Sequence, residues 1–360
     1  MSTATSRPTE PQASKKPRLT ERDRQVLDST FAIDSRVLAI LRIAMATFIL
    51  IEAAIDWNRP RDPQGLFAFL GQYGELIVVP FAVMMLVGFK TRWAVLLCWL
   101  TYGLTIRATF LDADLSVDVG DYILTLSLFW SIFLPLGRHL SLDARGGTAP
   151  PVRFLSLASA AFLLQVFIIY LSAGLLKEMN EWVFDATAME AILSNERFAG
   201  GFSEWILQFP TALAVMSVGT IALEVIGSIL IIVPGKSLPK RRLVIVPMFI
   251  ALHLGIALFM NLGVFPYICM FVWLIFLPSN VWDRVWGWFQ DNPPKPVALV
   301  DTNKWRAVVV AVAMVIAIVS NIITWMYYPD VTGWADGWQT VATYTLLYQQ
   351  WAMFSVPSSL

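Results

Sequence analysis

The 360-residue sequence has few charged residues, few histidines and few cysteines. Charged residues make up 14% of the chain, against about a quarter in soluble domains, and residues of the AVILMFWYC set make up 57%. This composition excludes both a soluble globular protein and an intrinsically disordered chain. The 26 basic residues balance the 26 acidic ones, so the sequence also lacks the positive field that a nucleic-acid-binding protein needs.

The scarcity of cysteine and histidine excludes further classes of protein. Cys98 and Cys269 both lie in apolar runs, where cysteine usually packs as a small hydrophobic residue. Two cysteines are too few for a disulfide-rich secreted domain. His139 and His253 are the only histidines, which excludes histidine-rich zinc and di-iron sites, and we predict no metal site.

Long apolar segments, in contrast, recur from Arg36 onward and predict an all-α, polytopic transmembrane bundle. A helix rises about 1.5 Å per residue, so about 20 apolar residues cross the hydrocarbon core of a membrane. Polar breaks divide the chain into about nine such segments. They run approximately over residues 36–55, 74–89, 92–108, 119–136, 153–176, 207–233, 242–260, 264–279 and 305–327. The second and eighth are short for a span, and half of a re-entrant hairpin is an alternative for the eighth.

The distribution of Lys and Arg predicts the orientation of the bundle, because these residues collect on the cytoplasmic side. When the segments are assigned alternately to the two sides, the side of the N-terminus holds about four times as many basic residues as the other. We therefore expect a cytoplasmic N-terminus and an external C-terminus. The predicted outer loops are rich in Asp and Glu, so polar chemistry is expected on the outer side.

The segments flanking this bundle (residues 31–327) differ from it in composition. Residues 1–30 are polar and contain a basic cluster but no apolar core, which predicts a disordered cytosolic tail. Residues 328–360 lack Lys and Arg and are rich in aromatic residues, which predicts an interfacial cap on the outer side. Within the bundle, about residues 183–203 are too polar to span and predict a short helix at the outer surface.

Two ionisable residues fall deep inside predicted spans, where a charge costs a few kcal/mol and needs a partner or a function. Arg42 lies in the first span and Glu224 in the sixth. On straight helices both would lie about 20 Å below the outer surface. We therefore expect Arg42 and Glu224 to form a structural ion pair that fixes helix register, with a catalytic role as the alternative.

Four charged residues lie near the outer ends of spans and could converge on one polar pocket: Glu52, Arg107, Asp121 and Lys177. The alternative for each is a helix-end charge that extends to water, and Asp121 at a helix N-terminus also gains from the helix dipole. The sequence leaves both interpretations open for Arg107 and Asp121, and favours the pocket for Lys177.

The residues before Lys177 give it a distinctive setting. Ser172, Ala173 and Gly174 are small and allow a neighbouring helix or a ligand to approach the backbone. A partly dry pocket favours a neutral amine, which acts as a general base, whereas a carboxylate such as Glu178 would favour the charged form. His253 lies about two turns below the outer end of its span, where a hydrogen-bonded core histidine and a proton carrier are both possible.

These motifs, taken in order, resemble those of the HTTM family of bacterial membrane proteins, which is related to the transmembrane core of vitamin K-dependent gamma-carboxylase. The resemblance covers about residues 35–357. It rests on residues 38–43, 88–92, 120–130, 133–137, 170–177, Glu224, His253, Asn261, 265–267 and 350–354. Each fragment is weak alone, and their shared order carries the identification.

The resemblance implies a chemistry. In the carboxylase, the lysine of the AGxxK run is regarded as the base that deprotonates vitamin K hydroquinone, so that oxygen addition yields a base strong enough to take a proton from glutamate before carbon dioxide adds. Lys177 occupies that position, and the resemblance implies a catalytic role for His253 as well. It also places Tyr170, Asn261 and Tyr267 in the lining of the same cavity. A reduced naphthoquinone is the cofactor implied.

This sequence departs from the carboxylase in two respects. Leu176 stands where the carboxylase has the first lysine of a pair, and the carboxylase's large lumenal domain, which helps to recognise protein substrates, is expected to be missing. Bacterial relatives include a membrane factor that matures a secreted peptide toxin. The resemblance therefore implies a multi-pass protein of the bacterial cytoplasmic (inner) membrane, with membrane lipid, a quinone and a secreted peptide as partners.

Two hypotheses for the function follow, from different classes. The first is a quinone-dependent enzyme or peptide-maturation factor that acts on a peptide or lipid at the outer face of the membrane. The second is a non-enzymatic binding protein, such as an immunity or assembly scaffold, whose polar pocket is a relic. A transporter is less favoured, because corresponding halves of the chain contain no pair of broken helices.

Overall fold

In the computed structural model the chain is almost entirely helical over the residues described, which confirms the all-α class. The structure describes residues 20–55, 57, 66–111, 119–145, 151–287, 298–300, 303–327, 337, 338, 347 and 351. The helices are α1 (Glu21–Phe31), α2 (Ser35–Ile55), α3 (Leu66–Val87), α4 (Thr91–Leu111), α5 (Val119–Ser131), α6 (Leu157–Leu175), α7 (Ala188–Ser194), α8 (Ser203–Ile206), α9 (Pro210–Ala222), α10 (Ser228–Ile232), α11 (Leu238–Phe259), α12 (Phe265–Trp273), α13 (Ser279–Gly287) and α14 (Lys304–Tyr327). Shorter 3₁₀ turns are η2 (Leu142–Ala144) and η5 (Leu274–Phe276), and π-helical turns are η3 (Asn180–Phe184) and η4 (Leu223–Gly227).

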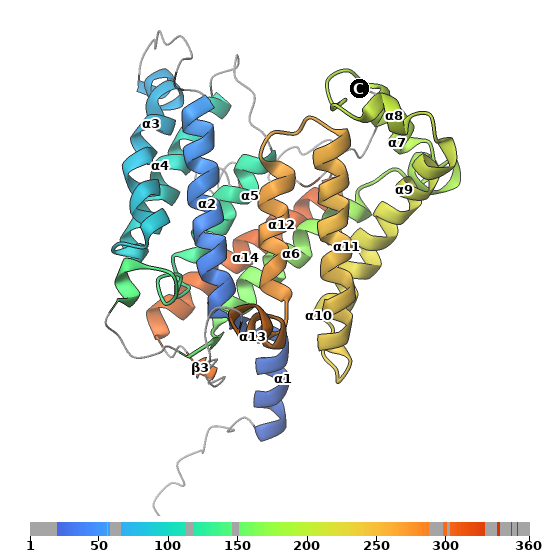
Figure 1. The fold of residues 1–360 in the computed structure, drawn as a ribbon. Helices are drawn as coiled ribbons and strands as arrows, with labels where there is room; N and C mark the ends of the chain where they lie inside the picture. Colours follow the sequence, from blue (N-terminus) through green and yellow to red (C-terminus); the bar gives the residue numbers. More distant parts are fainter. Residues whose placement is uncertain are drawn as a thin grey trace, which may run out of the picture.

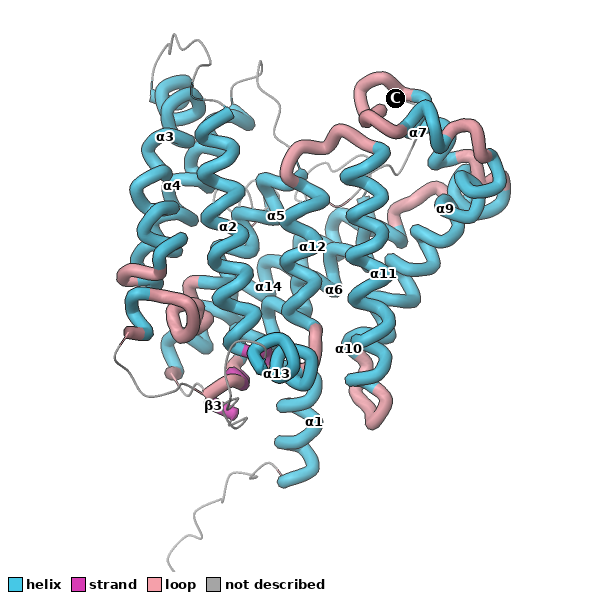
Figure 2. The backbone as a smooth tube through the Cα atoms, viewed as in Figure 1, coloured by secondary structure: helices cyan, strands magenta, loops and turns pink. Residues whose placement is uncertain are grey.

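The long helices pack into one bundle with its loops gathered at the two ends (Figures 1 and 2). Helix α12 packs against α2, α5 and α11, and α6 packs against α14 and η4. Helices α1 and α13 and the turn between α10 and α11 lie at one end, and α7 and α8 lie at the other (Figure 1). The outer surfaces of the helices are apolar: Val308, Val312 and Val315 of α14 are each about half exposed, as expected for contact with membrane lipid.

Five helices are long and apolar enough to cross a membrane, among the residues that the structure describes. They are α2, α6, α11, α14 (over Lys304–Met326) and the continuous segment Pro210–Ile232, which contains α9, η4 and α10. The segment Phe265–Phe276 meets α13 at a bend of 103°, which makes this pair a broken span or a re-entrant loop. A multi-pass membrane protein is therefore confirmed, while the count of nine spans and the orientation stay predictions.

Two of the predicted segments, the N-terminal tail and the surface helix, can be compared with the structure and differ from it. Residues 21–31 of the expected disordered tail and its boundary form α1, because Thr20 and Asp23 make reciprocal hydrogen bonds that cap the helix. The expected surface helix over 183–203 is much shorter, since only α7 is helical in its middle. The expected aromatic cap lies largely outside the described residues; Trp338, which is described, donates to the Ser320 hydroxyl of α14 over 3.1 Å.

A small three-stranded sheet joins distant parts of the chain at the α1 end of the bundle. Its strands are β1 (Ile33–Asp34), β2 (Arg153–Leu155) and β3 (Ala298–Val300), in that order. Strand β1 is antiparallel to β2, with Ile33 opposite Phe154, and β3 is parallel to β2. The sheet fixes the starts of α2 and α6 together, just outside the apolar bundle.

Arg36 connects the start of α2 to α13. Its guanidinium is fully buried and lies 2.7 Å from an Asp34 carboxylate oxygen and 2.8 Å from Asp283 of α13. Asp34 is itself almost completely buried. Charged pairs of this kind tolerate burial only while both partners are present, because an uncompensated buried charge loses its hydration.

We predict that Arg36→Met destabilises the protein by several kcal/mol, about 3–5 for a buried pair broken on one side, because Asp34 is left buried without its counter-ion. Thermal unfolding of the full chain in detergent measures this as a drop of several degrees in Tm. Arg24→Met, on the exposed surface of α1, is the matched control and should melt as the wild type does. A wild-type Tm for Arg36→Met would contradict the role of this ion pair.

Candidate functional site

A cavity of about 540 Å³ lies between α6, α7, α9, η4 and α11. Most of its lining is apolar, and its ionisable groups form two hydrogen-bonded pairs, Lys177 with Glu224 and Tyr170 with His253. The rest of the lining consists of Trp182, Met189, Ile192, Val215, Met216, Gly219, Thr220, Leu223, Met248, Ala251, Leu252, Gly255, Ile256, Phe259, Met260 and Phe265. This size and composition are typical of a site for a small apolar ligand held by a few polar groups.

Lys177 and Glu224 form a buried ion pair at the cavity wall. The Lys177 Nζ atom lies 2.8 Å from a Glu224 carboxylate oxygen, and each residue is only 6% exposed. The ammonium also donates to the Ala173 carbonyl over 3.2 Å and lies 4.8 Å from the ring centroid of Trp182. It therefore gains from the carbonyls at the C-terminal end of α6, from the negative face of an aromatic ring and from a carboxylate.

Local backbone features bring the two charges together. Lys177 follows the last turn of α6 by two residues, and Glu224 lies on the π-helical turn η4. Wide turns of this kind often occur at functional sites, since the extra residue redirects a side chain. A Cβ atom on Gly174 would lie 2.7 Å from Val225 Cγ2 and 3.0 Å from Glu224 Cβ, so only glycine permits this close approach of α6 to η4.

Tyr170 and His253 form the second polar pair, deeper in the bundle. The His253 Nδ1 atom lies 2.7 Å from the Phe249 carbonyl, which only accepts, so Nδ1 carries a hydrogen. In the neutral ring, Nε2 then accepts from the Tyr170 hydroxyl over 2.9 Å. The rings of Phe249 and Trp273 stack at 3.7 Å beside Tyr170. His253 is thus a hydrogen-bonded core residue that also lines the cavity.

The predicted ion pair between Arg42 and Glu224 is wrong. Glu224 pairs with Lys177, and the fully buried Arg42 guanidinium donates to the Leu140 carbonyl at the other end of the bundle. Gly88, in the left-handed region with φ +68°, leaves room for this guanidinium. The prediction assumed straight helices perpendicular to the membrane, whereas α9 runs obliquely to α11 (Figure 1) and η4 turns Glu224 toward α6.

Glu52 and Asp121 belong to a second cluster, centred on Tyr102. The Tyr102 hydroxyl lies 2.7 Å from a carboxylate oxygen of each residue, and the tyrosine side chain is buried. A hydroxyl has one hydrogen, so it donates to one carboxylate and the other contact needs a hydrogen from the second carboxyl group. The geometry therefore accommodates one proton shared by the cluster. Sequence reasoning missed Tyr102, although a tyrosine in an apolar span signals a need for a hydrogen-bond partner.

Comparison with known protein families assigns the chain. A family model of the HTTM domain matches residues 64–282, which is more than half of the sequence. The chain belongs to the HTTM domain family. The HTTM segment contains Lys177, Glu224 and His253, whereas α2, with Glu52, precedes it. No curated protein and no solved structure matches the chain.

The predicted site residues thus divide into groups in this HTTM protein. Lys177, His253 and Tyr170 line one cavity, together with Glu224, for which we predicted another partner. The remaining predicted residues are not among the described residues that line this cavity: Glu52, Arg107, Asp121, Asn261 and Tyr267. Asn261 is exposed, with its backbone N–H donating to the Phe198 carbonyl, and Tyr267 is 44% exposed.

We predict that Tyr102→Phe destabilises the HTTM bundle by about 1–3 kcal/mol, because two carboxyl groups lose the hydroxyl between them. The change is measured as a lowered Tm in detergent. Tyr267→Phe removes a hydroxyl from a half-exposed ring on α12 and is the control. Equal Tm values for Tyr102→Phe and the wild type would mean that the hydroxyl does not connect Glu52 and Asp121.

Proposed function

We propose that the cavity binds a reduced naphthoquinone or a similar apolar aromatic diol, and that the Lys177–Glu224 pair accepts a proton from one of its hydroxyl groups. The observation that carries this proposal is a buried, hydrogen-bonded ion pair in the wall of an otherwise apolar cavity of about 540 Å³. Ionisable residues inside a membrane bundle are costly, so such a pair facing a cavity is a functional candidate. The proposed location is the outer side of the bacterial cytoplasmic membrane.

The lining of the cavity fits an apolar ring. Met189, Met216, Met248 and Met260 supply flexible, polarisable side chains that adapt to a ligand, and Trp182 supplies an aromatic face. The volume lies within the usual range for small-molecule sites, about 300–1,000 Å³. The ionisable groups are confined to the two pairs, which would orient a ligand that carries one or two hydroxyl groups.

Proton transfer within the ion pair would make Lys177 a base. The 2.8 Å contact is short enough for the ammonium to pass a proton to the Glu224 carboxylate, which leaves a neutral amine. The amine then accepts the hydroxyl proton of the ligand while the electron pair stays on the ligand oxygen. After this step the pair holds one more proton than before. Glu224 is then a neutral carboxyl group and Lys177 is again an ammonium, and the two remain in contact.

The HTTM family supports a chemical role for this proton transfer. Through its resemblance to vitamin K-dependent gamma-carboxylase, a reduced naphthoquinone would supply the reducing equivalents for reaction with oxygen, and the protein would supply the base and the dry cavity. The target would be a secreted peptide or a lipid at the outer face. Because Leu176 stands in place of a second lysine, Glu224 would be the group that takes a proton from Lys177.

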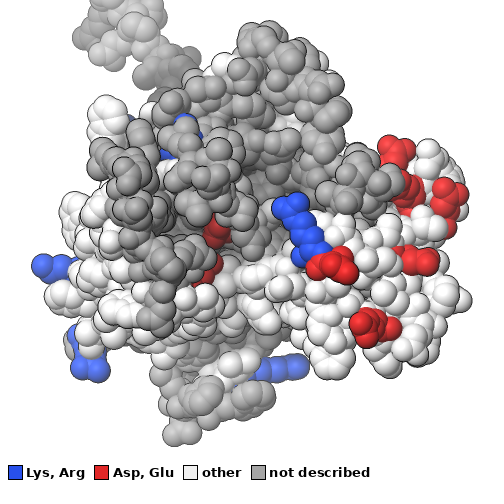
Figure 3. Space-filling view, turned by 90° about the horizontal axis from the view of Figure 1, so that it is seen from above, with Lys and Arg blue, Asp and Glu red and all other residues white. Residues whose placement is uncertain are grey.

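The alternative function is a non-enzymatic scaffold, and one surface favours it. Exposed acidic residues gather at the end of the bundle near α7 and α8 (Figure 3). Phe184, Phe202 and Trp205 are each more than half exposed in the same part of the chain. This acidic surface, formed by Glu178, Asp185, Glu190, Glu196 and Glu204, suits a basic partner such as a secreted peptide.

We predict that Lys177→Met retains binding of a reduced naphthoquinone but loses its conversion. The purified full-length protein is incubated with reduced menadione and oxygen, and oxidised products are measured by chromatography above the uncatalysed rate. A positioned base contributes about 10²–10⁴-fold, so the variant's rate should fall to near background. Lys240→Met, at an exposed position on α11, is the control.

The same variants separate the two functions in cells that depend on the protein. If Lys177→Met supports growth as well as the wild type at equal protein level, the catalytic proposal is contradicted. The scaffold function predicts that result and also predicts loss of function when Glu190 and Glu196 on the acidic surface are changed to Lys.

A further inference from the structure

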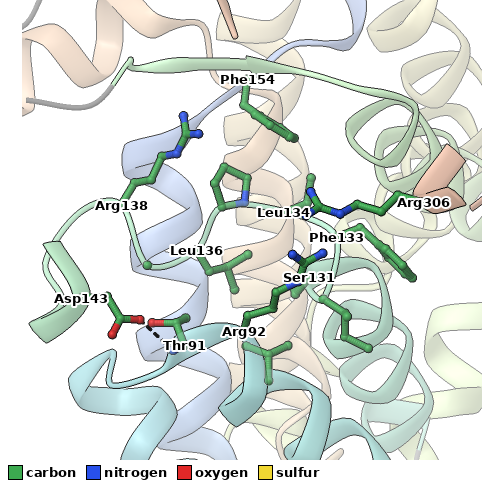
Figure 4. Close-up of a pocket in the computed structure, with 14 residues that line it drawn as sticks. Thr91, Arg92, Ser131, Phe133, Leu134, Leu136, Arg138, Asp143, Phe154 and Arg306 are labelled. Atoms are coloured by element: carbon green, nitrogen blue, oxygen red, sulfur yellow. Dashed lines mark hydrogen bonds between the residues drawn. The ribbon is translucent and has the colours of Figure 1, made fainter. Parts of the chain in front are cut away.

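A second cavity, of about 440 Å³, lies at the end of the bundle where α1 and α13 are found, away from the Lys177 site. Three arginines from separate elements line it: Arg92 at the start of α4, Arg138 in the loop after α5 and Arg306 at the start of α14. Figure 4 shows Arg92 and Arg306 extending toward one another, with Arg138 and Asp143 on the opposite side of the view.

The cavity lining carries more positive than negative charge. Asp143 is its one acidic residue among those described, and its carboxylate already accepts the backbone N–H groups of Lys90, over 2.8 Å, and Thr91, over 2.7 Å. Burial acts to raise the pKa of Asp143, but these hydrogen bonds and the nearby Arg42 guanidinium lower it below its usual value. Asp143 is therefore a fixed anion that caps α4, and the described lining holds three arginines and this one carboxylate.

Part of the Arg138 guanidinium has no hydrogen-bond acceptor within the part of the chain that the structure describes. Its Nη1 atom is buried and has no hydrogen-bond partner among the described residues, while the guanidinium lies 5.8 Å from the ring centroid of Phe154. Burial lowers the pKa of Arg138 because the charged form loses hydration. An anion in the cavity that Arg138 lines would supply a counter-charge and offset this cost.

Exposed tryptophans place this cavity at the level of lipid headgroups. Trp93 follows Arg92 and is 63% exposed, and Trp305 precedes Arg306 and is 81% exposed. Tryptophan is enriched at the membrane interface, where its ring lies among headgroups. Beyond Arg306, the exposed surface of α14 is apolar, with Val308 and Val309 each about half exposed.

We propose that this arginine cavity binds the phosphate group of an anionic phospholipid, with the acyl chains lying along the apolar surface of α14. Guanidinium groups bind phosphate through paired hydrogen bonds, and basic pockets between transmembrane helices on the cytoplasmic side are typical sites for anionic headgroups. Phe133, Leu134 and Phe154 in the lining contact the uncharged part of the headgroup region. A free phosphate ion offers the same oxygens but would make no use of the apolar surface.

The test compares lipids of equal chain length on the full-length protein in neutral detergent. Native mass spectrometry measures binding of phosphatidylglycerol and phosphatidylcholine, and we expect phosphatidylglycerol to bind about tenfold more tightly or better. Arg92→Gln with Arg306→Gln should weaken phosphatidylglycerol binding about tenfold or more and leave phosphatidylcholine binding unchanged. Arg145→Gln, exposed in the same loop region but absent from the cavity lining, is the matched control.

Three results would overturn this proposal. Equal binding of the two lipids by the wild type would rule out a site for an anionic headgroup. This comparison does not depend on the folding of any variant. Unchanged phosphatidylglycerol binding by a folded double variant places the lipid elsewhere. Stabilisation of the wild type by inorganic phosphate equal to that by phosphatidylglycerol, at the same concentration, would make it a site for soluble anions.

Discussion

The cost of removing a charge from water constrains the whole bundle. Among the described residues, every buried charged side chain forms an ion pair or donates a hydrogen bond to a carbonyl oxygen. Lys177 pairs with Glu224 inside the bundle, while Arg36, Arg42 and Arg242 reach carboxylates or carbonyls near the α1 end. In a medium without water these contacts decide which helix surfaces can meet, since apolar surfaces discriminate poorly between neighbours. The ion pair at Lys177 is the case in which the charges face a cavity, and the proposed function rests on it.

The sequence was sufficient to predict the class of fold and the setting of Lys177, which is buried and lines a cavity. Long apolar runs and scarce charge predict a helical membrane bundle, because about 20 apolar residues cross the membrane as a helix whose backbone hydrogen bonds are satisfied internally. Small residues before Lys177 predicted close approach of another segment, and Gly174 does lie against η4. The HTTM match over residues 64–282 agrees with the order of motifs that identified the family.

The partner of Glu224 could not be predicted, because it depends on the tilt of α9 and on the π-helical turn η4. Neither the tilt nor the π-helical turn produces a periodic pattern in the sequence. The prediction assumed straight helices and therefore gave the wrong partner, Arg42. The small sheet was also missed, since strands of two or three residues are too short for alternation of apolar and polar side chains to be visible. Tyr102 shows a third limit. Its hydrogen bonds to Glu52 and Asp121 connect three helices, and no local sequence pattern predicts how these helices are aligned with one another.

A double-mutant cycle at Lys177 and Glu224 tests the central claim, that these two charges are one buried unit. The Tm of Lys177→Met, of Glu224→Leu and of the variant carrying both changes is measured in the same detergent. Each single change should lower the Tm by several degrees, since it leaves one buried charge unpaired at a cost of about 3–5 kcal/mol. The double variant should recover most of that loss. Additive losses in the double variant would contradict the account, because they would mean that the two side chains do not interact.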